Sequence, residues 1–561
     1  MVGRINETFE KVKNCINTSK SFIVEAGAGS GKTWTLIESI KHILVTQATV
    51  LEKGNQQIAC ITYTNVAKDE ISVRIDNNPL VLVLTIHEFL WFAIKNYQKE
   101  LKTEIIKYNQ TDNKKHVENL ELKIEQTTIE YSQYGRKFEE GKITHDDVLM
   151  FSSILFNTYP KLSNIVANKF PFLFIDEYQD TEQRTVELIL DNLLTVAKGK
   201  IVIGFFGDSM QKIYNQGVGN IPLEYIKTEK LTFITKKENF RCSLKVIELL
   251  GKIRPDLIQS PTGNNLPGEI SFIHCNNNIA NSNGNYLSTL EFIKNIKGWK
   301  LESNTKILLL THRGIANKLG YEKLLAVYDT LDFGRDKLLN KEEPVSNFIL
   351  NNVEILVRLY LEKNYREFIK KLGIDGFVIN YHIDKNSISL MMNSLIELRK
   401  KETIKEVINY IFKNSLLTKP IKLDEFEVEI NKNKLDENEI RQKKFYDDLM
   451  NVKYSEFIQF NEFVEKFTPY STKHGVKGSE YDNVLVVIDD NSWFQYKFND
   501  VFANMKNNQD RYDRTRNLLY VCSSRARNNL IFLSLSRMDE KAMQTINNWF
   551  GSENVYDINN L

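Results

Sequence analysis

Short apolar runs, each ending in polar residues, recur along the N-terminal half of the chain. These runs begin at Ser21, Ile58, Pro79, Phe170 and Ile201. Strands of a parallel sheet show this pattern, because helices cover both faces of the sheet and functional groups gather at the carboxyl ends of the strands. A helical pattern from Thr33 to Leu44 follows the first run. We therefore expect residues 1 to about 90 and 165 to 245 to form one α/β sheet.

A second set of apolar runs lies in the C-terminal half, beginning at Ile270, Lys306, Asn483 and Asn529. Each set is interrupted by a stretch without strand-like runs. Residues 92 to about 150 interrupt the N-terminal set, and residues 320 to about 467 interrupt the C-terminal set. Their apolar residues repeat with the 3.6-residue period of packed helices. The pattern predicts an α/β protein with two sheets and two helical insertions.

Composition narrows the class of protein. Of the 561 residues, 42% are hydrophobic and 26% are charged, which is typical of a soluble globular chain of several domains. The formal net charge of +2 neither indicates nor excludes a nucleic-acid partner, so any basic surface must be local. The five cysteines lie far apart without zinc-ligand spacing, and no apolar run approaches the ~20 residues of a membrane span. We expect a cytoplasmic protein with no membrane partner.

A glycine-rich loop follows the first predicted strand. Its residues are Ala26, Gly27, Ala28, Gly29, Ser30, Gly31, Lys32 and Thr33, with alanine where the strict phosphate-loop pattern has its first glycine. Glycines let backbone N–H groups wrap phosphates at a helix N-terminus, Lys32 supplies a charge to the β- and γ-phosphates, and Thr33 offers a hydroxyl to Mg²⁺. A chance glycine-rich loop would rarely stand between an apolar strand and an amphipathic helix. The loop therefore predicts a site for ATP and Mg²⁺.

Two carboxylates end the apolar run that begins at Phe170. They are Asp176 and Glu177, and their place directly after apolar residues is costly unless a cation meets them. We expect Asp176 to hold Mg²⁺ through water and Glu177 to polarise the attacking water. A solvated acidic turn is the alternative interpretation.

The loop AGAGSGKT and the run DEYQD resemble superfamily 1A DNA helicases of the UvrD/Rep/PcrA type. The remaining motifs of that family follow in its order, as TYTNVAKDEI from Thr62, TIHEF from Thr85, HDDVL from His145, GDSMQKIY from Gly207, NFRCS from Asn239, TKHGVKGSEY from Thr472 and LLYVCSSRAR from Leu518. Together the motifs extend from about residue 22 to 530. The resemblance therefore covers nearly the whole chain.

The resemblance implies two RecA-like P-loop domains, 1A and 2A, each a parallel sheet flanked by helices. The implied segments are 1–91 and 165–238 for domain 1A, 92–164 for a 1B-like helical insertion, 239–319 and 468–561 for domain 2A, and 320–467 for a reduced 2B-like helical insertion. ATP would bind between the two RecA-like domains, and single-stranded DNA would lie across them.

The resemblance also implies roles for single residues. Arg241 and Arg525 match the family's two arginine fingers, which meet the charge on the γ-phosphate. Gln211 matches a glutamine that senses the γ-phosphate, Glu480 a nucleotide-contacting glutamate, and Phe240 an aromatic residue that stacks on the base. The positions at which the family contacts DNA are Tyr63, Thr64, Asn65, His87, Tyr214, Thr472 and His474. Taken singly, the aromatic and histidine residues could equally be packing residues, and each of the two arginines could equally form a surface salt bridge.

The chain departs from the family at two functional positions. It has no glutamine before Gln47, whereas the family reads adenine with a glutamine upstream of the phosphate loop. After Tyr214, residues 215–217 read Asn-Gln-Gly, where the family usually has a further base-stacking aromatic residue. We therefore expect relaxed purine selectivity and one stacking platform fewer.

These motifs imply an ATP-dependent DNA translocase or helicase that moves 3′ to 5′ on single-stranded DNA and acts on tailed duplexes. Only about 30 residues follow the last motif, and an independent domain normally needs about 50 or more, so we expect no C-terminal nuclease. A compact helicase of this kind also resembles the helicase-like subunit of the Gabija anti-phage system, which works beside an OLD-family nuclease. The alternative is a DNA-sensing ATPase subunit that switches a partner nuclease with little unwinding. Defence and DNA repair are both compatible with the motifs.

Apolar residues of the second insertion allow two interpretations. Phe348, Val353, Leu356 and Leu359 form a stripe at helical spacing. The stripe could pack inside a self-contained helical bundle, or it could dock a partner protein such as the nuclease.

Overall fold

The computed structural model describes residues 7–62, 65–111, 116–132, 136–197, 199–212, 217–275, 282–300, 304–309, 312–332, 334–339, 341–374, 382–432, 435–465, 470–471, 479–491 and 495–561. Internal contacts divide the chain into two compact units. Unit 1 comprises Met1–Ser282, Glu480–Asn483 and Asp489–Leu561, and unit 2 comprises Asn283–Ser479 and Val484–Ile488. All the residues of the predicted ATP site therefore belong to unit 1.

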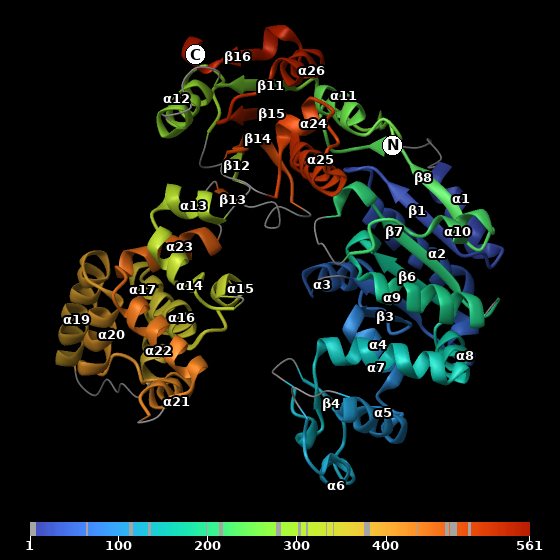
Figure 1. Cartoon of the computed structure of the whole chain (residues 1–561), viewed down its shortest axis with the longest axis horizontal. Helices are drawn as coiled ribbons and strands as arrows, with labels where there is room; N and C mark the ends of the chain where they lie inside the picture. The colour runs from blue at the N-terminus through green and yellow to red at the C-terminus, as the bar shows by residue number, and fades with distance from the viewer. Residues whose placement is uncertain are drawn as a thin grey trace. The chain divides into compact units, whose positions relative to one another are not determined.

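The first sheet of unit 1 has six parallel strands in the order β3-β2-β6-β7-β1-β8 (Figure 1). Their bounds are β1 Phe22–Ala26, β2 Ile58–Thr62, β3 Val81–Thr85, β6 Phe172–Asp176, β7 Val202–Gly207 and β8 Thr232–Lys236. The apolar runs of the N-terminal half account for all of these strands except β8. That strand lies at the edge of the sheet and leaves Thr232 and Phe233 exposed, so it carries no continuous apolar run.

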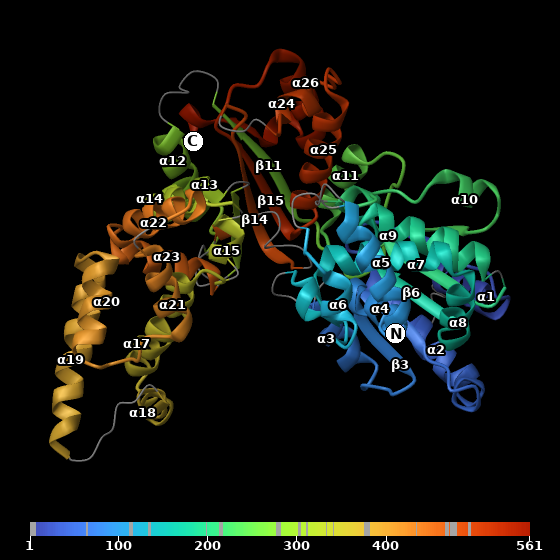
Figure 2. The ribbon, with the colours of Figure 1, turned by 60° about the horizontal axis from the view of Figure 1, so that its bottom comes forward.

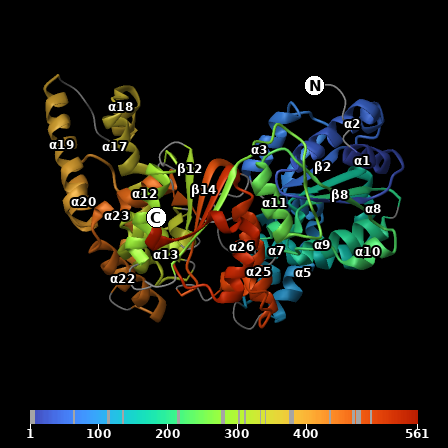
Figure 3. The same ribbon diagram turned by 90° about the horizontal axis from the view of Figure 1, so that it is seen from above.

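Side chains of the central strands alternate between two hydrophobic cores, one on each face of the sheet. Phe22 and Val24 pack in one core and Ile23 in the other, as the two-residue period of a strand requires. Helices α1 (Glu7–Asn17) and α2 (Lys32–Lys53) lie side by side on the first core (Figure 3). The second core lies under α4 (Ile86–Ile94), α7 (His145–Thr158), α8 (Pro160–Lys169) and α9 (Gln183–Leu188). Burial on both faces explains why these strands are apolar throughout.

The first insertion is mostly helical. It contains α5 (Gln98–Thr111) and α6 (Leu120–Ile124), whose Leu120 and Ile124 are buried as the helical spacing predicts. It also contains two short strands, β4 (Glu130–Tyr131) and β5 (Lys142–Ile143), which pair in parallel. A pairing of two residues is too short to leave a periodic signal in the sequence.

The strands of a second parallel sheet are divided between the two units. The second set of apolar runs forms β11 (Glu269–His274), β12 (Thr305–Leu309), β14 (Tyr481–Ile488) and β15 (Ala526–Ser534). In unit 1, β11 pairs in parallel with β15 and with β16 (Val555–Asp557). In unit 2, β12 pairs in parallel with β13 (Tyr470–Ser471). The remaining helices of unit 1 are α3 (Asn65–Arg74), α10 (Leu223–Lys227), α11 (Leu244–Ile253), α24 (Phe498–Phe502), α25 (Gln509–Ser523) and α26 (Glu540–Phe550).

Apart from β12, β13 and the Val484–Ile488 part of β14, the described elements of unit 2 are helices. Its helices are α12 (Ser282–Asn295), α13 (His312–Leu319), α14 (Glu322–Tyr328), α15 (Gly334–Leu339), α16 (Pro344–Phe348), α17 (Glu354–Leu361), α18 (Tyr365–Ile374), α19 (His382–Lys401), α20 (Ile404–Lys413), α21 (Ile421–Ile430), α22 (Glu437–Met450) and α23 (Tyr454–Val464). Helices α19 and α20 pack on one another (Figure 2). Phe348, Val353 and Leu356 are fully buried, so most of the apolar stripe packs inside the helical unit itself.

The two RecA-like domains expected from the motifs correspond to these two parallel sheets with their flanking helices, and this fold class is confirmed. The segment boundaries listed above stay predictions. None of the described helices combines the length and the apolar character that a membrane span needs.

Candidate nucleotide-binding site

The glycine-rich loop connects β1 to α2, and its backbone conformation depends on glycine. Gly29 and Gly31 have φ angles of 70° and 77°, in the left-handed region that side-chain-bearing residues rarely adopt. At Gly27, an added Cβ would lie 2.4 Å from Nε2 of Gln259. Helix α2 begins at Lys32, so the loop leads into a helix N-terminus and brings a lysine to the same place. This is the geometry that phosphate binding requires.

Lys32 faces the two carboxylates that follow β6. Its Nζ lies 3.8 Å from Oδ1 of Asp176 and forms a closer ion pair with Glu177. Burial opposes the charge of Lys32, but Glu177 and Asp176 outweigh that effect and raise its pKa. Glu177 has a φ angle of 52°, a left-handed conformation that is strained for a residue with a side chain. Lys32 therefore compensates the charge of the acidic turn.

The loop residues fit a nucleotide with Mg²⁺. Oγ of Ser30 is buried and has no hydrogen-bond partner among the described residues, so a phosphate oxygen could satisfy it. Thr33 and Asp176 would hold the metal, as in other phosphate-loop proteins. Among the described residues there is no cluster of three or more His, Cys, Asp or Glu side chains that could hold a metal by themselves.

Gln211 and Arg525 meet directly. Nη2 of Arg525 donates to Oε1 of Gln211 at 2.9 Å, and Nε2 of Gln211 donates to Oδ2 of Asp208 at 2.7 Å. Arg525 is fully buried, and burial together with the positive charge of Arg241 lowers its pKa to about 10. A buried guanidinium with a lowered pKa is one that an additional anion would stabilise. The pair is therefore suited to receive the γ-phosphate.

The motif that begins at Asn239 packs against the phosphate loop. Nδ2 of Asn239 donates to the Ala28 carbonyl at 3.0 Å, and the Phe240 amide donates to the Gly29 carbonyl at 3.0 Å. Nε of Arg241 lies 2.5 Å from Oε2 of Glu480. Thus two residues expected to contact nucleotide are paired with each other.

Phe240 presents an accessible ring at the loop. Its side chain is 49% exposed, which argues against a core residue. A Cβ added at Gly31 would lie 3.8 Å from the Phe240 ring and 3.9 Å from Cβ of Trp34. The ring is therefore free to stack on a base beside the loop.

Sequence reasoning missed several residues that touch the loop. The hydroxyl of Tyr520 accepts a hydrogen bond from the Ala28 amide at 3.0 Å, and Nε2 of Gln259 donates to the Ala28 carbonyl at 2.8 Å. Tyr520 belongs to the motif LLYVCSSRAR, so its position was available as a signal, whereas Gln259 lies in no motif. Arg254 was also missed, although it forms buried ion pairs with Asp208 and Glu25.

Most of the predicted DNA contacts lie outside the described residues. These are Tyr63, Thr64, Tyr214, Thr472 and His474. Asn65 begins α3 and is exposed. His87 lies in α4 with its ring centroid 4.5 Å from that of His145, and burial, with the neighbouring His145, lowers its pKa to about 4. His87 is therefore neutral at physiological pH.

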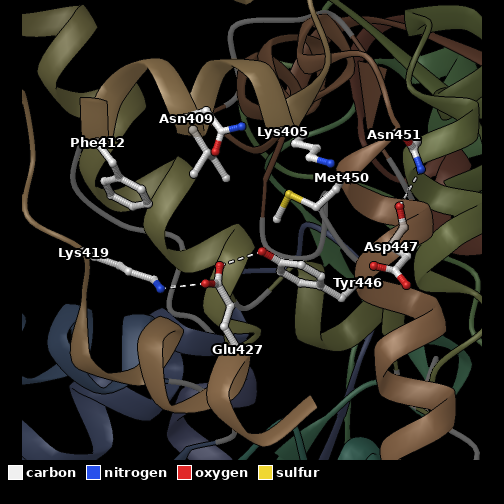
Figure 4. A pocket seen from close by; sticks show the side chains of 10 residues that line it. Lys405, Asn409, Phe412, Lys419, Glu427, Tyr446, Asp447, Met450 and Asn451 are labelled. Atoms are coloured by element: carbon white, nitrogen blue, oxygen red, sulfur yellow. Dashed lines mark hydrogen bonds and ion pairs between the residues drawn. The ribbon is translucent and has the colours of Figure 1, made fainter. Parts of the chain in front are cut away.

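Unit 2 contains a cavity of about 330 Å³ between α20, α21 and α22 (Figure 4). Some of its polar side chains interact with one another. Glu427 accepts a hydrogen bond from the Tyr446 hydroxyl at 2.6 Å and forms an ion pair with Lys419 at 2.6 Å. None of the predicted site residues lines it. The cavity itself does not indicate a ligand.

Known proteins resemble this chain in sequence. A family model described as an AAA domain matches residues 10–217. The Gabija protein GajB of Bacillus cereus (strain HuB5-5) is 28% identical, over 93% of this chain and 94% of its own. The ATP-dependent DNA helicase Rep of Buchnera aphidicola subsp. Schizaphis graminum is 24% identical, over 91% of this chain and 90% of its own. The ATP-dependent DNA helicase PcrA of Staphylococcus aureus (strain Mu50 / ATCC 700699) is 26% identical, over 37% of this chain and 33% of its own.

Among solved structures, the Pif1 helicase from Candida albicans overlaps 57% of this chain and 54% of its own at 14% identity, with a TM-score of 0.28, a likeness too weak to bear on the fold. The similarity to Rep and GajB is more informative, because it extends far beyond the phosphate loop that many ATPases share. The resemblance read from the motifs is thereby confirmed: the chain is similar in sequence to the ATP-dependent DNA helicases Rep and PcrA and, over nearly its whole length, to the Gabija protein GajB.

Proposed function

We propose that the protein is an ATP-dependent DNA translocase that moves 3′ to 5′ on single-stranded DNA and couples hydrolysis to strand separation. The observation that carries the proposal is a link between two pairs of residues: Lys32, at the start of α2, forms an ion pair with Glu177, and the charge of Glu177 acts on buried Arg525, which donates to Gln211. Residues from the two ends of the chain thereby supply both the loop and the cations that a transferred phosphoryl group needs.

Each of these side chains has a distinct task in the proposed hydrolysis. Lys32 leaves Glu177 to bind the β- and γ-phosphates, and Glu177 then accepts a proton from the attacking water. Arg525 and Arg241 stabilise the charge that develops on the γ-phosphoryl oxygens. Mg²⁺, held by Thr33 and Asp176, would neutralise charge on the β- and γ-phosphates when bound.

Motion on DNA rests on the motif series. Asn65 and His87 match motif positions at which helicases of this type contact single-stranded DNA. In the first sheet, Asn65 follows β2 and His87 follows β3. Contacts to phosphates and stacked bases suit a motor that steps along any sequence. Single-stranded DNA should therefore stimulate ATP hydrolysis, with an affinity that falls as salt increases.

Tailed duplexes test this function directly. The full chain should unwind a short duplex with a 3′ single-stranded tail in the presence of ATP and Mg²⁺, and it should fail on the same duplex with a 5′ tail. Lys32→Ala provides the inactive control. Equal unwinding from both tails would overturn the polarity, and hydrolysis without DNA stimulation would overturn the motor function.

A second candidate is a DNA-sensing ATPase that switches a partner nuclease. The full-length similarity to GajB, whose name places it in Gabija, favours this candidate. An OLD-family-like nuclease would be the partner. The buried stripe at Phe348, Val353 and Leu356 is not accessible for docking, so the partner would have to bind elsewhere. DNA-stimulated hydrolysis with no unwinding from either tail would support this function over the motor.

A further inference from the structure

Arg254 is a fully buried arginine that lies in none of the helicase motifs. It follows the last residue of α11 (Leu244–Ile253), and only 1% of its surface is accessible. Its amide caps the helix by donating to the Leu250 carbonyl. A buried guanidinium is costly unless carboxylates compensate its charge.

Two buried carboxylates from the first sheet compensate that charge. Nη1 of Arg254 lies 2.6 Å from Oδ1 of Asp208, and Nη2 forms an ion pair with Glu25. Glu25 stands in β1 directly before Ala26, and Asp208 directly follows β7. Tyr178 and Ser209 also donate hydrogen bonds to Glu25. Arg254 therefore joins the strand that enters the phosphate loop to the end of its neighbour in the sheet.

Asp208 depends on this cation. Burial raises the pKa of Asp208 above its ordinary value, Arg254 opposes this rise, and Glu25 adds to it. Without Arg254, two carboxylates would face each other inside the protein. At least one of them would have to take up a proton or turn away.

Asp208 in turn holds Gln211. Oδ2 of Asp208 accepts the hydrogen bond from Nε2 of Gln211, and this leaves Oε1 of the same amide facing Arg525. The amide can therefore present its oxygen to Arg525 only while Asp208 keeps its orientation. We infer that Arg254 is a positioning residue of the ATPase, which orients the Gln211–Arg525 pair for hydrolysis by fixing Asp208 and Glu25. This inference rests on the proposed function, and it assigns to Arg254 no contact with the nucleotide.

A double-mutant cycle in the full chain tests the inference. Arg254→Met should lower kcat for ATP about tenfold or more, with KM changed by no more than about twofold, because it disturbs transition-state contacts rather than nucleotide binding. In a Gln211→Ala background the same substitution should lower kcat by less than about threefold, because residues that act through one group are not additive. Arg254→Lys should recover part of the loss, since lysine keeps the charge but cannot hold two carboxylates with a planar fork.

A charge-matched variant separates positioning from folding. Arg254→Met combined with Glu25→Gln removes one positive and one negative charge. Of the two carboxylates that Arg254 pairs with inside the protein, only Asp208 then remains. This variant should fold, by its thermal unfolding transition, and still show the low kcat. Lys245→Met, on the exposed side of α11, is the matched control and should behave as the wild type.

Three outcomes would overturn the inference. One is an equal fractional loss of kcat in the Gln211→Ala and wild-type backgrounds, which would make Arg254 independent of Gln211. Another is full recovery of kcat in the charge-matched variant, which would leave Arg254 only a structural role. The third is a wild-type kcat for Arg254→Met. Failure of the proposed function would look different, because the wild-type chain itself would then hydrolyse ATP without stimulation by DNA or would unwind duplexes with 3′ and 5′ tails equally.

Discussion

Arg525 donates a hydrogen bond from Nη2 to Oε1 of Gln211 across 2.9 Å, although 314 positions separate the two residues in sequence. The contact joins the end of α25 to the turn after β7. A γ-phosphate oxygen would compete with the amide oxygen for the same donor, because the guanidinium is buried and its pKa is lowered. On the proposed function, this pair is where the protein would distinguish ATP from ADP.

Arg525→Ala should retain nucleotide binding and lose catalysis. In related phosphoryl-transfer enzymes an arginine finger contributes ~10³–10⁵-fold to the rate. That range corresponds to about 4–7 kcal/mol of transition-state stabilisation. Binding of a fluorescent ATP analogue and steady-state hydrolysis measure the two effects separately. Arg537→Ala, an exposed arginine of the same region, is the control. If binding and hydrolysis fell by the same factor, Arg525 would be a ground-state contact.

Lys32→Ala should abolish ATP hydrolysis. The substitution removes the cation that lies between the loop and the carboxylates Asp176 and Glu177, so those two groups would also repel each other. Phosphate release should fall to background in a colorimetric assay. Lys41→Ala removes a half-exposed lysine from the same helix and should leave the rate unchanged. Near-wild-type turnover of Lys32→Ala would mean that the ATP site lies elsewhere.

GTP should support turnover to a substantial fraction of the rate with ATP. No glutamine precedes Gln47, and the exposed ring of Phe240 can stack on either purine without reading its edge. Initial rates at saturating ATP and GTP measure the selectivity. Phe240→Ala should raise KM for both nucleotides, whereas Phe240→Tyr should not. A GTP rate below about one-hundredth of the ATP rate would contradict relaxed selectivity, since that ratio is about 2.7 kcal/mol of discrimination.

Acid should destabilise the protein partly through His87. Its pKa is about 4 in the folded protein, below the ordinary value of 6.5, so the unfolded chain binds more protons between these pH values. Stability from this group is therefore present above about pH 6.5 and is lost as the pH falls towards 4.

A pair of histidine variants isolates that contribution. Because the ring is only half-buried, we expect His87→Gln to recover about 1–2 kcal/mol of the stability lost between pH 7 and pH 4.5. Urea unfolding at both pH values measures the difference. His116→Gln, which replaces an exposed histidine, should not reduce the loss. If wild type and His87→Gln lost the same free energy of unfolding between pH 7 and pH 4.5, the pKa of His87 would not differ between the folded and unfolded chains.

Local sequence patterns were enough to predict the parallel strands, the phosphate loop and the two carboxylates after β6. These features are local: a buried parallel strand must be apolar along its length, and the left-handed turns at Gly29 and Gly31 favour glycine. Motif order added Gln211, Arg241 and Arg525. The structure places Arg241 against Gly29 of the loop and joins Arg525 to Gln211 by a hydrogen bond. The edge strand β8 was not predicted, because part of it is exposed to solvent and it therefore has no continuous apolar run.

Contacts between side chains that lie far apart in sequence could not be predicted from local patterns. Nothing in the local sequence couples Arg254 to Glu25 and Asp208, or the hydroxyl of Tyr520 to the Ala28 amide. Such pairings arise because a charge or a backbone group that is buried must find its partner wherever the folded chain brings one. The buried stripe at Phe348 and Leu356 shows the same limit, since periodicity predicted an apolar face and packing decided that the helical unit covers it itself.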